Sequence, residues 1–206
     1  MTALYQQKYG SFVSLGGIAR FKNQLFFRAC VRAVAPSRSD RILEIGCNDG
    51  VLLRHLADHA GDVRGIDVNE DMVATLDDER IQAMSATDLR FADERFDKVC
   101  AFEVLEHIED LSSVFREVHR VLRVGGAFVL SFPFEIIRGQ AAWLDSLAVY
   151  GDLRHSRMLH VHRLMPAKIR RIAARLPFAV AESRLRMVPG PFFFMRLEKT
   201  GSLPGS

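Results

Sequence analysis

Hydrophobic residues recur along this chain in two rhythms, one typical of amphipathic helices and the other of buried strands. From Ile18 to Val34, apolar side chains return every three or four residues, which predicts a helix that ends before Pro36. Short apolar runs follow at residues 41–45, 62–67, 81–84, 96–102 and 127–132. Such runs, alternating with helical patterns, predict the parallel strands of an α/β sheet.

The C-terminal part continues this pattern after one interruption. A helix is expected at 166–176, and two closing strands are expected at 178–186 and 192–197. Phe192, Phe193 and Phe194 alternate in the last strand, so we expect them to enter the core on both faces of the sheet. Residues 133–165 break the alternation, and long connections of this kind cover substrates in α/β proteins.

The length of 206 residues suits one domain with a sizeable core. We divide the chain into an N-terminal arm and covering helix (1–40), a cofactor-binding core (41–132), a substrate-covering insertion (133–165), and a closing helix with strands (166–200). No apolar run approaches the ~20 residues of a membrane span, and the N-terminus lacks the apolar core of a signal peptide. The three cysteines are widely spaced and odd in number, which favours a reducing, cytoplasmic location.

Charge is unevenly distributed, although the net charge is only +3. Residues 1–41 carry seven Lys and Arg against one acid, a net of +6; residues 42–150 carry ten against 21, a net of −11; residues 151–206 carry eleven against three, a net of +8. The basic ends either meet an anionic substrate, nucleic acid or a membrane surface, or they pack against the acidic middle of the same chain.

A glycine bend follows the first predicted strand, in the sequence RILEIGCNDG of residues 41–50. Glycine suits this bend because it adopts positive φ and lets a ligand approach the backbone, while the N–H groups at the next helix start face the ligand. Strand, bend and helix in this order open a nucleotide-binding α/β domain. The glycines are Gly46 and Gly50 with Asn48 between them, and Leu53 follows, which disfavours the dinucleotide fingerprint of dehydrogenases.

The second predicted strand ends in Asp67, 21 residues beyond Gly46. At that distance from a glycine bend, a carboxylate at a strand's carboxyl end accepts hydrogen bonds from the ribose hydroxyls of a nucleotide cofactor. Val68 follows and would pack on the adenine face. Asn69 is suited to the N-cap of the next helix.

The bend, with Glu44 two residues before its first glycine, resembles the first motif of class I S-adenosylmethionine-dependent methyltransferases (E/D-x-G-x-G-x-G). Asn48 replaces the middle glycine, and asparagine also tolerates left-handed backbone geometry. The run FDKVCAFEVLEH at 96–107, followed by LRVGG at 122–126 and an apolar strand, resembles the second half of the same family. Together these motifs cover residues 41–132.

The resemblance implies a Rossmann-like, doubly wound α/β sheet of about seven strands, mostly parallel with an antiparallel last strand, and helices on both faces. It implies S-adenosyl-L-methionine as cofactor and S-adenosyl-L-homocysteine as product. Asp88 matches the acid that hydrogen-bonds the adenine amino group in this family. The residues expected to contact the cofactor are Glu44, Gly46, Cys47, Asn48, Gly50, Asp67, Val68, Asp88, Leu89, Phe102 and Glu103.

Three ionisable residues after the fourth strand carry the candidate chemistry. Glu103, Glu106 and His107 are similar to the metal-binding segment of ubiquinone-pathway O-methyltransferases and small-RNA 3′-end methyltransferases, where a later histidine, here His162, completes the site. The same run occurs in methyltransferases without a metal, so the divalent-metal site Glu103, Glu106, His107 and His162 is the less favoured alternative. We predict His107, Glu103 and His162 as catalytic, with His107 as general base or acceptor-orienting residue.

These observations predict a methyltransferase that moves a methyl group to O, N or C of a small molecule by in-line displacement, the small molecule being anionic if the basic ends contact it. One alternative is an RNA methyltransferase that uses the basic C-terminal segment as a phosphate track. Another is a non-catalytic cofactor-binding or scaffold protein of the same fold. The sequence leaves the acceptor, the metal dependence and the oligomeric state open.

Overall fold

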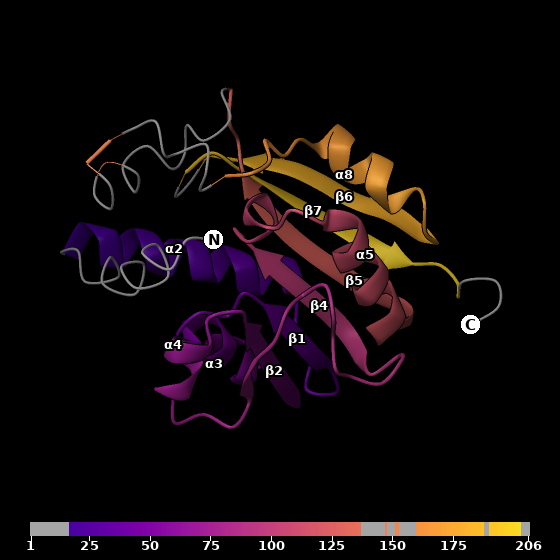
Figure 1. Cartoon of the computed structure of the whole chain (residues 1–206), viewed down its shortest axis with the longest axis horizontal. Coiled ribbons are helices and arrows are strands. Elements are labelled where there is room, and N and C mark those ends of the chain that lie inside the picture. Colours follow the sequence, from indigo (N-terminus) through magenta and orange to yellow (C-terminus); the bar gives the residue numbers. More distant parts are fainter. Residues whose placement is uncertain (1–16, 137–146, 148–150, 153–159, 188–189, 203–206) are drawn as a thin grey trace.

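The computed structural model describes residues 17–136, 147, 151–152, 160–187 and 190–202 (Figure 1). The predicted N-terminal arm and most of the predicted insertion, including Trp143 and Tyr150, lie outside these residues. Within the described part of the chain, no helix is long and apolar enough to cross a bilayer.

Seven strands form one sheet in the order β3-β2-β1-β4-β5-β7-β6 (Figure 1). Strands β1 to β5 pair in parallel, whereas β7 runs antiparallel to both β5 and β6. The predicted mostly parallel sheet with an antiparallel last strand is therefore confirmed. The strands are β1 (Arg41–Ile45), β2 (Asp62–Asp67), β3 (Ile81–Ala83), β4 (Phe96–Phe102), β5 (Leu122–Pro133), β6 (Phe178–Arg186) and β7 (Phe192–Lys199).

Helices cover both faces of the sheet, and each face has its own hydrophobic cluster. Helices α2 (Gly17–Val34) and α3 (Val51–Ala57) cover one face, and α5 (Leu111–Val121) and α8 (Pro166–Ala173) cover the other. The short helix α4 (Glu70–Ala74) packs beside β3. Strand side chains alternate between the clusters: Phe192 and Phe194 pack on the α2 side and Phe193 on the opposite side, as predicted.

Strand β5 begins earlier than its apolar run suggested, which is the main difference from the expected elements. Leu122 pairs with Phe96, and the next paired position is Ala127 with Lys98, so the register shifts between them. The extra residues form an irregularity at Gly125, whose φ of 77° is in the left-handed region. The two glycines of the LRVGG run therefore lie inside an irregular strand.

The winding of the sheet reverses between β1 and β4, which are neighbours although β2 and β3 come between them in sequence. In open α/β sheets, ligands bind at the carboxyl ends of the strands at such a switch point. Ile45 pairs with Ile66 of β2 and with Ala101 of β4. The residues that follow these three strands therefore meet at one edge.

Candidate functional site

The bend after β1 adopts left-handed backbone geometry at three positions. Gly46, Asn48 and Gly50 have φ of 72°, 47° and 74°. The N–H groups of Gly46 and Cys47 both donate to the carbonyl of Ile66, at 2.8 and 3.0 Å, and hold the bend against the end of β2. The expectation that asparagine would tolerate the geometry of the missing glycine is confirmed at Asn48.

Packing within the chain is a second reason for glycine in this bend. A Cβ atom on Gly46 would lie 2.3 Å from Cγ2 of Val104, and one on Gly50 would lie 2.5 Å from Cδ1 of Ile81. Both distances are far below van der Waals contact. The glycines of the bend therefore serve backbone freedom and ligand approach, and they also fit closely against Val104, after β4, and Ile81 of β3.

The Asp67 carboxylate joins the bend to the loop after β2. One oxygen accepts the backbone N–H of Asn48 and the other accepts that of Asn69, both at 3.0 Å. A carboxylate has about four acceptor sites, so each oxygen retains capacity for a hydroxyl. Beside it, Val68 is 52% exposed, and Asn69 caps α4 through a side-chain bond from the Met72 N–H, as predicted. The carboxylate is thus fixed at the sheet edge next to an open apolar side chain.

Glu44 lies on β1 beneath the bend and is the most unusual group of the predicted cofactor set. It is buried, and its Oε2 has no hydrogen-bond partner among the described residues. Burial, with smaller contributions from Asp49 and Asp67, raises the pKa of Glu44 well above its usual range. An unpartnered buried carboxylate oxygen is costly, and a cationic group bound at the bend would give it a partner.

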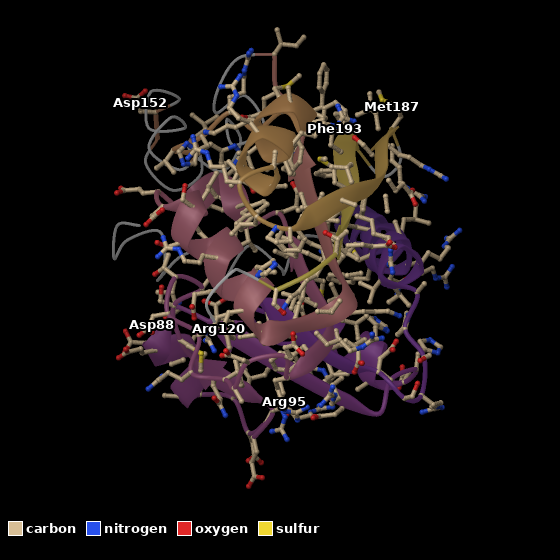
Figure 2. The ribbon with its side chains drawn as sticks, turned by 90° about the vertical axis from the view of Figure 1, so that its right-hand side faces the viewer. Asp88, Arg95, Arg120, Asp152, Met187 and Phe193 are labelled. Carbon is tan, nitrogen blue, oxygen red and sulfur yellow. The ribbon has the colours of Figure 1, made fainter. Side chains whose placement is uncertain are left out.

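The remaining predicted cofactor residues differ in exposure. Asp88 is exposed on the loop after β3, and Figure 2 shows its side chain directed away from the body of the protein. Leu89 and Phe102 are buried, and the Leu89 N–H donates to Glu117 at 2.8 Å. Burial raises the pKa of the Cys47 thiol, which disfavours the thiolate that a nucleophilic cysteine requires.

Glu103 follows β4 in a strained conformation, with φ of 55°. Left-handed geometry costs a non-glycine residue about 1–2 kcal/mol and is concentrated at functional sites. Its Oε1 accepts the hydroxyl of Ser131 on the neighbouring strand β5, at 2.8 Å. Burial, opposed by this hydrogen bond, raises the pKa of Glu103 to about 8.

A second cluster lies just beyond, at the short 3₁₀ helix η2 (Leu105–His107). Ligand atoms of Glu106, His107 and His160 all lie within 4.8 Å of one another. The two imidazole rings meet edge to face with centroids 5.0 Å apart. Glu106 is buried with an unpartnered Oε2, and burial followed by the nearby Glu103 raises its pKa. Two imidazoles and one carboxylate are a common ligand set for first-row divalent cations.

The histidine of this cluster is His160 and not the predicted His162. The backbone N–H of His162 donates to the backbone carbonyl of Glu106, at 3.2 Å, so the segment that contains both histidines lies beside η2. The imidazole of His162 then turns away, with Nε2 3.0 Å from the Glu109 carbonyl and Nδ1 2.9 Å from Lys168 Nζ. Of the four residues of the predicted metal site, the group therefore contains Glu106 and His107 but neither Glu103 nor His162.

Two further residues of the site were missed by the sequence reasoning. Glu135, buried at the end of β5, has Oε1 2.8 Å from Nδ1 of His160. This contact leaves Nε2 of the same ring for the cluster, as do carboxylates that hydrogen-bond metal-binding histidines. The other is Ser131, which orients Glu103. Only the fold brings Ser131 of β5 and Glu135, two residues past the end of β5, to the site, because neither belongs to a recognisable motif.

A doubly wound sheet with a glycine bend at its switch point, an acid after β2 and ionisable groups after β4 defines the class I S-adenosylmethionine-dependent methyltransferase fold. Residues 43–130 match the family model of a methyltransferase domain. This part of the chain is therefore similar to methyltransferase domains, and the sheet has the fold of that class.

Individual relatives agree with this assignment. The ubiquinone biosynthesis O-methyltransferase of Pseudomonas aeruginosa is 35% identical over 100 residues, 44% of this chain and 43% of the relative. The match thus spans less than half of that relative. A structure of a complex between the Trm112 methyltransferase activator and a methyltransferase from Haloferax volcanii aligns with a TM-score of 0.71 and 17% identity, over 96% of this chain and 98% of the other. The structure of an S-adenosylmethionine-dependent methyltransferase from Mesorhizobium loti aligns with a TM-score of 0.64 and 22% identity, over 84% of this chain and 95% of the other.

Proposed function

We propose that this protein is an S-adenosylmethionine-dependent O-methyltransferase of a small-molecule hydroxyl, assisted by a divalent cation. The observation that carries the proposal is the convergence of Glu106, His107 and His160 within 4.8 Å, just past the strand end where Glu103 lies. Groups of this type would bind a cation that lowers the pKa of an acceptor hydroxyl. Transfer to nitrogen needs no such assistance, because a neutral amine is already nucleophilic.

The residues of the bend fit the proposed cofactor. The unpartnered Oε2 of Glu44 would accept a hydrogen bond from an ammonium group, and Asp67 has spare acceptor sites for ribose hydroxyls. The exposed Val68 would cover one side of the adenine, and Asp88 would accept its amino group. When bound, S-adenosylmethionine supplies an activated methyl group, so the task of the protein is mainly positioning and exclusion of water.

On the acceptor side, the chain offers oriented groups that differ in role. Glu135 would hold His160 in the tautomer that presents Nε2, and Ser131 would hold Glu103. His107, whose ring meets that of His160, would orient the acceptor. The cation site fits the residues present, because the buried Oε2 of Glu106 has no other partner in the described chain.

Other features support a substrate of this kind. The P. aeruginosa relative is an O-methyltransferase by name, and the family model of a methyltransferase domain matches residues 43–130, which contain the bend. Three free, buried cysteines suit a reducing cytoplasm, which we also propose as the location. An RNA substrate is the second candidate, because Arg170, Arg171 and Arg175 are exposed on and just after α8. Loss of binding to a single-stranded RNA probe as salt rises would favour that candidate.

The test uses two histidines two residues apart. Mn²⁺ binding, followed by electron paramagnetic resonance, should fall at least tenfold in His160→Ala and remain in the matched control His162→Ala. With 3,4-dihydroxybenzoate as probe acceptor, EDTA should abolish the formation of S-adenosylhomocysteine, while the affinity of the protein for S-adenosylhomocysteine stays intact. Equal Mn²⁺ binding by both variants, or turnover that survives EDTA, would overturn the cation-assisted mechanism but not cofactor binding.

A further inference from the structure

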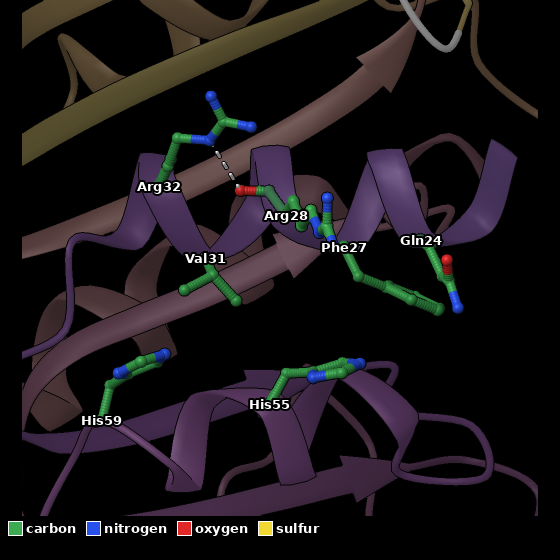
Figure 3. Close-up of a pocket in the computed structure, with 7 residues that line it drawn as sticks. All are labelled: Gln24, Phe27, Arg28, Val31, Arg32, His55 and His59. Carbon is green, nitrogen blue, oxygen red and sulfur yellow. Dashed lines mark hydrogen bonds between the residues drawn. The ribbon is translucent and has the colours of Figure 1, made fainter. Parts of the chain in front are cut away.

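Helix α2 contacts two different parts of the molecule through neighbouring residues. Figure 3 shows Phe27 directed toward His55 of α3, across a hollow between the two helices. Phe26 packs on the sheet instead, with its ring centroid 5.2 Å from that of Phe192 and 6.2 Å from that of Phe194, both on β7. Because β7 runs antiparallel to β5, its first residues lie beside the last residues of β5, at the carboxyl edge of the parallel strands.

Phe194 lies in the same row of the sheet as residues of the candidate site. Ser131 of β5 pairs with Phe102 of β4 on one side and with Phe194 of β7 on the other. Paired residues of neighbouring strands point to the same face, and the ring centroids of Phe102 and Phe194 are 6.1 Å apart. The Ser131 hydroxyl donates to the Glu103 carboxylate, so this row connects Glu103 to Phe194.

Arg186, the last residue of β6, brings a positive charge to this row. Its guanidinium lies over the Phe194 ring, 5.6 Å from the ring centroid. Burial and then the Glu103 carboxylate raise the pKa of the buried Cys30 thiol on α2, whereas the Arg186 guanidinium lowers it, so both charges act on the same thiol. Neighbouring strands lie about 4.8 Å apart, and a substituted aromatic ring is long enough to bridge one such step, from the Ser131 strand to the Phe194 strand.

The guanidinium of Arg186 has no counter-ion among the described residues. None of their carboxylates is within ion-pair distance of it, and no hydrogen bond joins its N–H groups to any of them. Arg184, two residues earlier on the same strand, pairs with Glu182 at 2.7 Å and has 67% of its side chain exposed. Arg186 is half-buried. An aromatic face attracts a guanidinium but accepts few of its five N–H donors, so this group retains capacity for an anion.

We propose that Arg186 binds an anionic substituent of the methyl acceptor, which makes the acceptor an aromatic hydroxy acid, a ring that carries both a hydroxyl and a carboxylate. This inference rests on the proposed methyl transfer to a hydroxyl and names its substrate class. A guanidinium matches a carboxylate with two parallel N–H donors. The half-buried rings of Phe26 and Phe192 would contact the aromatic body, while the hydroxyl would lie on the side of Glu103.

The experiment compares two acceptors that differ in charge but hardly in shape, 3,4-dihydroxybenzoate and 3,4-dihydroxybenzamide. Calorimetry measures binding of each to the full chain saturated with S-adenosylhomocysteine, and turnover is measured with S-adenosylmethionine. The wild type should prefer the carboxylate at least about tenfold, and R186Q should lose this preference, mainly through KM. R186K keeps the charge without the planar fork and should regain part of it. The matched control R184Q changes the exposed neighbour and should keep the preference of the wild type.

Equal affinity of the wild type for the two acceptors would overturn the proposal, even if both are methylated. Failure of the carboxylate acceptor to bind would also overturn it, as would a preference that R186Q retains. Failure of the proposed reaction gives a different result, because binding does not require methyl transfer. A preference that depends on Arg186 without any turnover would support the anion site and contradict the reaction. Thermal melting of each variant verifies that it is folded.

Discussion

Glu44→Gln should change cofactor affinity and stability in opposite directions. Glu44 is buried beneath the glycine bend, with one carboxylate oxygen that has no partner and a pKa raised chiefly by burial. If the bend binds the ammonium end of the cofactor, this carboxylate raises the affinity for the cofactor and lowers the stability of the cofactor-free protein. Glutamine keeps the shape of the side chain and removes its charge, so the two effects can be separated.

The magnitudes follow from the two environments. A hydrogen bond between charged groups contributes about 1.5–3 kcal/mol, so the variant should bind S-adenosylhomocysteine roughly 10- to 150-fold more weakly. In the cofactor-free protein, the raised pKa means that the folded state holds a proton that the unfolded chain releases above about pH 4.3. Stability of the wild type therefore falls as pH rises through that range. At pH 8 the variant should be more stable than the wild type by at least about 1.4 kcal/mol, the equivalent of one unit of pKa, because glutamine neither takes up a proton nor carries a charge at this buried site.

The assays are calorimetric titration with S-adenosylhomocysteine and urea unfolding of the cofactor-free protein at pH 4.5 and pH 8. The two proteins should have nearly equal stability at pH 4.5 and diverge at pH 8. Glu182→Gln is the control, because it makes the same chemical change in a solvent-facing residue, which forms an ion pair with Arg184 on the edge strand. Unchanged affinity in Glu44→Gln, or a variant less stable than the wild type at pH 8, would refute the reasoning.

Three further predictions concern the same framework. Asp67→Ala should weaken S-adenosylhomocysteine binding by about 1–3 kcal/mol and also lower stability, because two backbone N–H groups lose their acceptor; calorimetry with undiminished affinity would exclude the ribose role. Gly46→Ala should destabilise the fold by at least ~1 kcal/mol because of its φ of 72° and the 2.3 Å approach to Val104, and Val104→Ala in the same chain should restore part of the loss; melting curves without this rescue would contradict the packing argument. Burial alone would raise the pKa of Asp97, but the Arg41 N–H and the guanidinium groups of Arg123 and Arg41 hold it below its usual range, so the stability it contributes is lost as pH falls below about 3.9. Asp97→Asn should flatten the acid side of the stability curve, and an unchanged acid side would rule this out.

The sequence predicted most of the fold because its apolar runs are short and clearly separated. The strands and the helix α2 lie where periodicity placed them, except for the start of β5, and the alternation of Phe192 to Phe194 assigned both faces of the last strand. The start of β5 was missed because its first residues contain two glycines and no apolar run, whereas the pairing of Leu122 with Phe96 is a tertiary contact that the local pattern does not contain.

The candidate site divides in the same way. The structure brings together the predicted residues of the bend, of the end of β2 and of the segment after β4, because chain position fixes them at the carboxyl edge of parallel strands. It groups His160 rather than the predicted His162 with Glu106 and His107. The two histidines lie two residues apart in an irregular segment, so the sequence pattern does not tell which of them faces η2. Glu135 reaches His160 only through the return of the chain along β5 and past it, which no local pattern encodes.

A crystal structure with S-adenosylhomocysteine bound would show whether the glycine bend and Asp67 form the cofactor site. We predict the amino-acid end of the ligand over residues 46–50, its ammonium group beside Glu44, and a ribose oxygen about 2.6–3.2 Å from the Asp67 carboxylate. A ligand bound elsewhere, or a ribose without contact to Asp67, would contradict it.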